Sequence, residues 1–142
     1  MEDKAENQFD FWLGEWDVTW GADGKGTNHV ERILGGKIIQ ENFSAPDFQG
    51  ISVSAYDPER ELWCQTWVDN HGTYLDFTGR FEGGKMVLRR DAIVRGEACQ
   101  QRMVWYEIQA DKFEWSWERS DDGGKTWRVL WQIHYSRKTT SR

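Results

Sequence analysis

The chain has 142 residues and a formal net charge of −6, and its charges alternate in sign without forming a basic cluster. This acidic balance argues against nucleic acid as a partner, and no window approaches the ~20 apolar residues of a membrane span. Ten tryptophans, seven phenylalanines and four tyrosines allow a substantial core in a chain that is only 38% hydrophobic, because each buried ring removes about 150–250 Å² from water. We expect one domain, residues 1–142.

The beginning of the chain and its cysteines favour a cytoplasmic protein. The run MEDKAENQFDFW is acidic and lacks an apolar core, so it does not resemble a secretory signal. Cys64 and Cys99 are too few for a disulfide framework. The three histidines have no spacing typical of metal ligands, and we predict no metal site.

Alternation with a period of two residues dominates the chain, whereas apolar stripes with a helical period are absent. Turn signals such as Gly35-Gly36 and Gly83-Gly84 interrupt this alternation, because glycine supplies the positive φ that tight hairpins need. The segments between the turns predict ten strands, at residues 12–20, 27–34, 37–43, 50–56, 61–68, 73–81, 85–90, 100–108, 112–119 and 127–137.

Ten short strands in up-and-down order can close into a barrel, because the first and the last strand then run antiparallel. Closure pairs both edge strands and leaves no edge exposed. The residues before Phe11 are expected to form a short plug. We therefore predict an all-β, ten-stranded antiparallel up-and-down barrel with a short N-terminal plug.

Pairing across the Gly-Gly hairpins sorts the side chains into an inner and an outer face. Leu34 opposite Lys37 in the first hairpin places Val30 opposite Glu41, and in the second Phe81 lies opposite Met86. Rings at alternate positions of the last strand assign Val129 and Trp131 to the same inner face. The inner face then holds these candidate ligand contacts: Asn28, Arg32, Glu41, Gln65, Trp67, Trp115, Trp131 and Tyr135.

Among the inward-facing polar residues, Glu41 has the greatest need of a partner, because a carboxylate among apolar rings must be protonated or paired. Arg32, its diagonal neighbour across the strand pair, is the expected partner. Two interpretations stay open: the residues fix the strand register or Glu41 faces solvent, or carboxylate and guanidinium together grip a polar ligand head.

Gly14-Glu15-Trp16 resembles the G-x-W of the calycin barrels, which include lipocalins, fatty-acid-binding proteins and nitrobindin-like domains. In lipocalins an arginine from the last strand lies across this tryptophan at the barrel floor, and the matching residues here are Trp16 and Arg137. Much of the chain also resembles an uncharacterised family of small bacterial calycin-like domains without established activity, in the runs FDFWLGEWDV, GTNHVERILGG, YDPERELWCQTWVD and SDDGGKTW.

The resemblance implies an interior cavity for a small hydrophobic or amphipathic molecule, and we predict neither a cofactor nor catalytic residues. One alternative is a cofactor-free isomerase or lyase that uses Glu41, Arg32, Tyr106 and Tyr135. Another is a nitrobindin-like haem protein that uses His134. The apolar stripe of its strand takes the opposite face, however, so His134 is expected outside the barrel.

The stretch SDDGGKTW, Ser120 to Trp127, also matches the S-x-D-x-G-x-T-W pattern of the Asp-box in sialidases and related propellers. A propeller carries the pattern in several blades, and here it occurs once. We interpret it as a turn in which Asp122 accepts backbone hydrogen bonds and Trp127 anchors the next strand in the core. A cation bound at Asp121 and Asp122 is the alternative.

Rings on both faces of some strands, such as Trp105 and Tyr106, predict apolar rings on the outside of the barrel. A second subunit commonly covers such a surface, so a homodimer is the expected protein partner.

Overall fold

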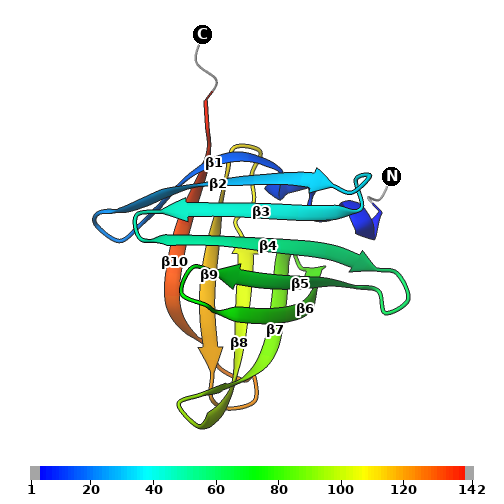
Figure 1. Cartoon of the computed structure of the whole chain (residues 1–142). Coiled ribbons are helices and arrows are strands. Elements are labelled where there is room, and N and C mark those ends of the chain that lie inside the picture. The colour runs from blue at the N-terminus through cyan, green and yellow to red at the C-terminus, as the bar shows by residue number, and fades with distance from the viewer. Residues whose placement is uncertain (1–3, 140–142) are drawn as a thin grey trace.

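The computed structural model describes residues 4–139, which form a closed antiparallel barrel of ten strands (Figure 1). Two short 3-10 helical turns, Ala5–Asn7 and Asp10–Trp12, come first. The strands are β1 (Gly14–Trp20), β2 (Gly24–Ile33), β3 (Ile38–Ala45), β4 (Phe48–Asp57), β5 (Leu62–Asp69), β6 (Tyr74–Glu82), β7 (Lys85–Val94), β8 (Glu97–Tyr106), β9 (Lys112–Ser120) and β10 (Arg128–Arg137).

Each strand pairs with its neighbours in the chain, and β1 pairs with β10 to close the barrel. At this seam Trp16 lies opposite Arg137 and Val18 opposite Tyr135. The predicted all-β, up-and-down fold with a short N-terminal segment is confirmed. Among the described residues, no helix has the length and apolar character needed to cross a membrane.

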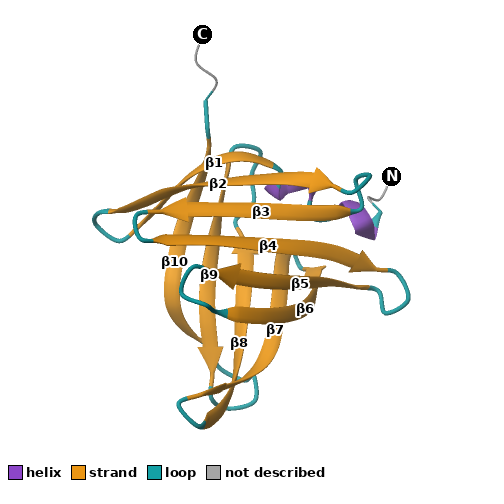
Figure 2. Ribbon diagram, in the orientation of Figure 1, coloured by secondary structure: helices purple, strands orange, loops and turns teal. Residues whose placement is uncertain are grey.

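The barrel is flattened. In Figures 1 and 2, β2 to β6 run horizontally and β7 to β10 run roughly from top to bottom, so two layers of strands cross steeply. The connections are short loops (Figure 2). Side chains that alternate inward from both layers meet between them and form the core.

The registers expected across the Gly-Gly hairpins are confirmed. Val30 lies opposite Glu41 between β2 and β3, and Phe81 lies opposite Met86 between β6 and β7. The tight turns fix these registers, and with them the face on which every residue of the two hairpins lies.

The hairpin of β7 and β8 is longer than predicted. Its ladder continues to the pair Val94 and Glu97, whereas the sequence predicted strands ending at 90 and beginning at 100. Arg95 and Gly96, at φ 51° and 82°, form a two-residue turn that lets pairing continue to the tip. The sequence did not indicate this extension, because the alternation of polar and apolar residues is weak between residues 91 and 99.

The face assigned to the start of β10 was wrong. A β-bulge shifts the register between Val129 and Trp131, so Val129 is 56% exposed while Trp131 faces the interior. Trp127 precedes the strand and does not enter the core: its ring lies 4.1 Å from the guanidinium carbon of Arg102.

The outer surface is not rich in tryptophan, contrary to expectation. Its exposed large hydrophobic side chains, within residues 4–139, are Leu34, Ile51, Val53, Val68, Tyr74, Ile93, Val129 and Leu130. Trp105 faces inward and is 1% exposed. The described residues therefore lack the exposed tryptophan rings on which the expected homodimer interface rested.

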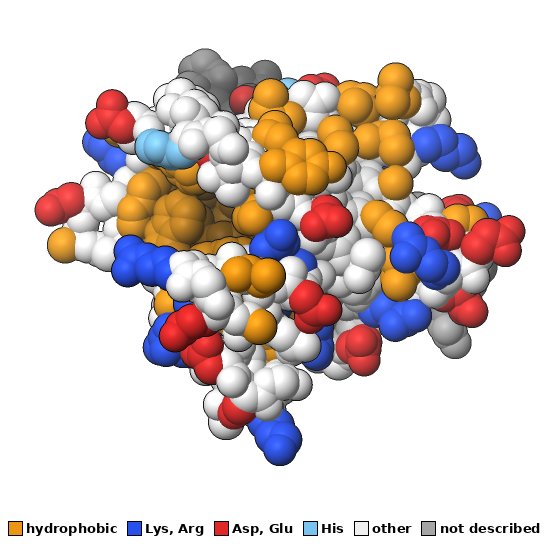
Figure 3. All heavy atoms as spheres, turned by 60° about the horizontal axis from the view of Figure 1, so that its bottom comes forward, with side chains coloured by type: hydrophobic (Ala, Val, Ile, Leu, Met, Phe, Trp, Pro, Cys, Tyr) orange, Lys and Arg blue, Asp and Glu red, His pale blue; other side chains and the backbone are white. Residues whose placement is uncertain are grey.

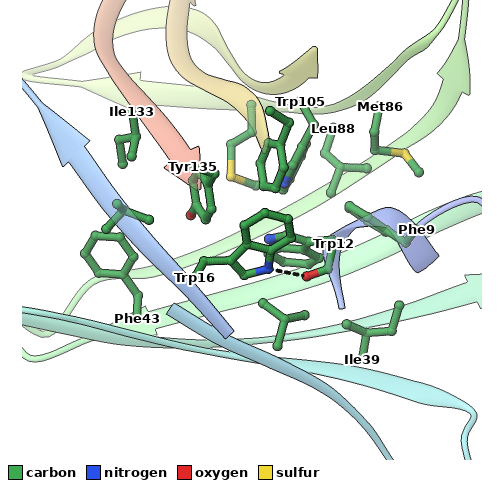
Figure 4. Close-up of a cluster of buried hydrophobic side chains, with 14 of the residues drawn as sticks. Phe9, Trp12, Trp16, Ile39, Phe43, Met86, Leu88, Trp105, Ile133 and Tyr135 are labelled. Atoms are coloured by element: carbon green, nitrogen blue, oxygen red, sulfur yellow. Dashed lines mark hydrogen bonds between the residues drawn. The ribbon is translucent and has the colours of Figure 1, made fainter. Parts of the chain in front are cut away.

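The segment before β1 plugs one end of the barrel; we call residues 5–12 the plug. Phe9 and Trp12 are fully buried, and Figure 4 shows both reaching into the hydrophobic cluster. The Phe9 ring stacks on Trp12 at 4.8 Å and meets the edge of Trp105 at 5.0 Å. The Trp16 indole N–H donates to the Trp12 carbonyl at 2.8 Å, which ties the plug to β1.

Candidate functional site

A cavity of about 310 Å³ lies between the two layers, toward the end away from the plug. Along β5, Trp63 touches Phe9 of the plug, whereas Trp67 lines the cavity. Figure 3 shows a hollow in this face of the molecule, walled by hydrophobic side chains. The lining residues are Glu41, Phe43, Phe48, Trp67, Asp69, Thr73, Leu75, Phe77, Gln101, Met103, Trp115, Trp117, Trp131, Ile133 and Tyr135.

Aromatic rings form most of the cavity wall. Trp115 and Trp131, from the neighbouring strands β9 and β10, meet edge to face at 5.7 Å. Phe48 lies 6.0 Å from both Trp131 and Trp67, and so links the two layers across the cavity. Gly50 makes room for the wall, because a Cβ there would lie 2.0 Å from the Trp67 ring.

Glu41 is a buried polar residue of the cavity lining. Its two carboxylate oxygens each accept one hydrogen bond at 2.7 Å, from the Asn28 amide of β2 and from the Ser52 hydroxyl of β4. The same Asn28 nitrogen donates to the Tyr135 hydroxyl at 2.9 Å. Four strands thus assemble one buried polar group at the cavity wall.

Burial determines the protonation of this group. Burial raises the pKa of Glu41 above its usual range, and the hydrogen bonds from Ser52 and Asn28 offset only part of that rise. Burial and the neighbouring Glu41 carboxyl raise the pKa of Tyr135 well above its usual range. Tyr135 therefore keeps its proton at neutral pH, and because its oxygen accepts from Asn28, its O–H is available as a donor.

Arg32 is not the partner of Glu41, which corrects the sequence-based expectation. Its guanidinium donates to the Asp10 carboxylate at 2.5 Å and to the Gly36 carbonyl at 2.8 Å. Arg32 lies opposite Ile39 in the pairing of β2 with β3, whereas Glu41 lies opposite Val30. From its position the long Arg32 side chain reaches the carboxylate of Asp10 in the plug. Within residues 4–139 the donors to Glu41 are therefore the neutral side chains of Asn28 and Ser52.

Five of the eight predicted ligand contacts line the cavity: Glu41, Trp67, Trp115, Trp131 and Tyr135. Asn28 lies behind Glu41 and Tyr135, holding both. Gln65 is buried but donates to the Ser54 hydroxyl at 2.9 Å and does not line the cavity. Arg32 lies at the plug.

Asp69 is a lining residue that the sequence reasoning missed. Its carboxylate accepts from the Trp67 indole at 2.9 Å and from the backbone N–H groups of His71 and Thr73. Partial burial alone would raise the pKa of Asp69, but these hydrogen bonds together lower it. The signal lay in the turn Asn70-His71-Gly72, since an aspartate before a turn commonly caps it.

The G-x-W resemblance corresponds to a definite contact at the plugged end. The Arg137 guanidinium carbon lies 4.2 Å from the Trp16 ring centroid, and its Nη1 donates to the Leu13 carbonyl at 2.8 Å. Gly14 has φ 128°, and a Cβ there would lie 2.3 Å from the same Nη1. Glycine is required at this position because the guanidinium occupies the place of its side chain.

The groups needed by the two alternative functions do not assemble. His134 is 54% exposed on the outer face, where its Nδ1 contacts Glu114, so this axial ligand does not fit a haem in the barrel. Tyr106 accepts a hydrogen bond from Gln132, a residue that points out of the barrel, and so lies apart from Glu41. With Arg32 at the plug, only Glu41 and Tyr135 of the catalytic hypothesis share the cavity.

The stretch SDDGGKTW forms a turn, as the sequence indicated. Asp122 accepts from the backbone N–H groups of Lys125 and Thr126 and from the Thr126 hydroxyl, which lowers its pKa to about 2. Asp121 instead pairs with Arg119 at 2.9 Å. Both carboxylates are thus engaged, and within the part of the chain that the structure describes no three His, Cys, Asp or Glu side chains could hold a metal ion.

No protein-family model and no curated protein sequence matches the chain. The closed ten-stranded barrel is compatible with a calycin-like fold.

Proposed function

We propose that this protein binds a small hydrophobic or amphipathic molecule in the cavity between its two layers. The observation that carries the proposal is a space of about 310 Å³ that the chain's own aromatic rings surround and leave unfilled. Small-molecule sites are typically concave, mostly apolar and provided with a few placed polar groups, and volumes of about 300–1,000 Å³ are usual.

The polar groups are arranged for orientation of a ligand. Glu41 and Tyr135 come from opposite layers and meet through Asn28 at the inner wall. Asp69 and Thr73 lie at another part of the lining, beside the loop between β5 and β6. A ligand would bury its apolar body against the rings and direct a polar atom at one of these groups.

Titration with N-phenyl-1-naphthylamine, a neutral dye that fluoresces in apolar surroundings, tests the proposal. We expect saturable binding to the native protein and none to Leu75→Trp, whose larger side chain fills the cavity. Leu130→Trp, on the outer surface, is the matched control and should bind the dye as the native chain does. Equal binding by all three proteins, or by none, would contradict the proposal.

A further inference from the structure

We propose that the cavity selects organic cations, that is, small molecules with an ammonium group on an apolar body. This inference rests on the proposed function and names the chemical class of its ligand. The first observation is the charge of the lining: it contains two carboxyl groups, Glu41 and Asp69, and none of its residues is a lysine, arginine or histidine.

The arginines near the cavity are engaged by groups of the protein itself. The Arg90 guanidinium contacts the lining from outside it: it lies 6.0 Å from the Phe77 ring, donates to the Gln101 side chain at 2.8 Å and lies 3.9 Å from the Asp76 carboxylate. Arg32 pairs with Asp10 of the plug, and Arg137 lies over Trp16 and donates to backbone carbonyls. Glu41 is held by the neutral donors Asn28 and Ser52, and no cationic side chain of the described residues pairs with it. A carboxyl group buried without a cationic partner leaves that position to be taken by a ligand.

The rings of the wall favour the same class. Four tryptophans and three phenylalanines line the cavity: Trp67, Trp115, Trp117, Trp131, Phe43, Phe48 and Phe77. The faces of such rings carry negative charge density, and cation–π attraction strengthens when the cation is shielded from water. Aromatic walls combined with carboxylates attract an ammonium group, whereas a carboxylate ligand would be repelled by Asp69, and by Glu41 wherever it is ionised.

The protonation of Glu41 adds a characteristic readout. Tyr135 from β10 is a titratable residue linked to Glu41 through the shared Asn28 amide. The side chains that β2 and β4 place against Glu41 are the neutral Asn28 and Ser52. A bound cation favours the ionised carboxylate, so its binding releases a proton wherever Glu41 is protonated in the free protein. Affinity for a cation should then rise with pH through the titration of Glu41 and level off, and affinity for a neutral ligand should not.

Three probes with a common phenyl group test the inference: 2-phenylethylammonium, 2-phenylethanol and phenylacetate, each titrated by calorimetry. We expect the cation to bind about tenfold more tightly than the alcohol, and phenylacetate to bind most weakly. In Glu41→Gln the advantage of the cation should fall to about threefold or less, while 2-phenylethanol keeps its affinity and so reports an intact cavity. Glu114→Gln removes the same charge from the outer face and should keep the native preference.

The outcomes separate the two proposals. If 2-phenylethanol binds as tightly as 2-phenylethylammonium, or if N-phenyl-1-naphthylamine binds and the ammonium does not, cation selection is overturned and the cavity remains a binding site. If Glu41→Gln and Glu114→Gln lower the cation's affinity equally, the preference comes from net charge, and Glu41 has no part in it. If neither the dye nor any of the three probes binds, the proposed function fails as well.

Discussion

The two ends of the barrel are built from the same kind of residue and differ in what fills them. At one end Phe9 and Trp12 of the plug pack against Trp63 and Trp105, and all four rings are at most 2% exposed. At the other end Trp67, Trp115, Trp117 and Trp131 are only half-buried and surround a space. Aromatic composition does not decide whether a barrel is solid, because the same rings close an end only where another segment supplies the filling.

Their polar groups differ in the same way. The plugged end satisfies its charges internally, with Arg32 on Asp10 and Arg137 on backbone carbonyls. The open end holds a buried carboxyl group, Glu41, whose donors among residues 4–139 are both neutral. The charged side chains of the packed end have partners within the protein, whereas the buried carboxyl group of the cavity has no cationic partner among the described residues.

The largest expected effect comes from emptying the plugged end. Trp12→Ala removes a fully buried ring and should lower the free energy of unfolding by about 3–5 kcal/mol, measured by urea denaturation. Trp127→Ala, which removes a half-buried ring outside the barrel, should cost about 1–2 kcal/mol. Similar losses in the two variants would show that the plug contributes little to stability.

The closure of the plugged end depends on Gly14. Gly14→Ala places a methyl group where Arg137 lies and forces a non-glycine residue to a positive φ, so we expect a loss of about 2–4 kcal/mol. Gly21→Ala is the control: its φ is 59°, nothing lies within 4 Å of the added Cβ, and about 1 kcal/mol should be lost. Equal melting-temperature shifts would rule out the clash with Arg137.

The pH dependence of stability should single out the open end. The folded-state pKa of Glu41 is raised, so its contribution to stability is fully present below the unfolded value and is lost as pH rises through the folded pKa. The free energy of unfolding of Glu41→Gln, taken relative to that of the native chain, should therefore be higher at pH 8 than at pH 4. Urea denaturation of both proteins at the two pH values measures it. Glu31→Gln, at an exposed position of β2, should not show this dependence, and a relative loss at pH 8 in Glu41→Gln would contradict the account.

The smallest expected effect lies outside both ends, in the turn after β9. The pKa of Asp122 is lowered from 3.8 to about 2 in the folded protein. Asp122 therefore stabilises the turn at pH values above its unfolded-state pKa of 3.8, and this stabilisation is lost as the pH falls through about 2. The amide NMR signals of Lys125 and Thr126 should titrate with that midpoint. In Asp122→Ala these amides should exchange with solvent faster, whereas Asp121→Ala should leave them unchanged.

Local pattern was sufficient to predict most of the fold. The Gly-Gly turns fixed the pairing of Val30 with Glu41 and of Phe81 with Met86, and alternation placed Trp67, Trp115 and Trp131 inside. The bulge at Val129 was not predictable, because one inserted residue leaves an apolar run that still resembles alternation.

Features set by distant contacts could not be derived from alternation. Period-two reasoning placed Arg32 and Glu41 on one face, but the direction of the Arg32 side chain depends on Asp10, which precedes it by 22 residues and lies in the plug. The cavity itself is a volume left between rings, and its size depends on side-chain directions that an inward or outward assignment does not specify.

The most direct test uses the tryptophans as reporters of both ends. The indole N–H signals of the protein would be followed by NMR during titration with 2-phenylethanol and with 2-phenylethylammonium. The account predicts shifts for Trp67, Trp115, Trp117 and Trp131, with Trp12, Trp16 and Trp105 unchanged. Shifts at the plugged end, or at no indole at all, would contradict the claim that one end is closed by the chain and the other is open to a ligand.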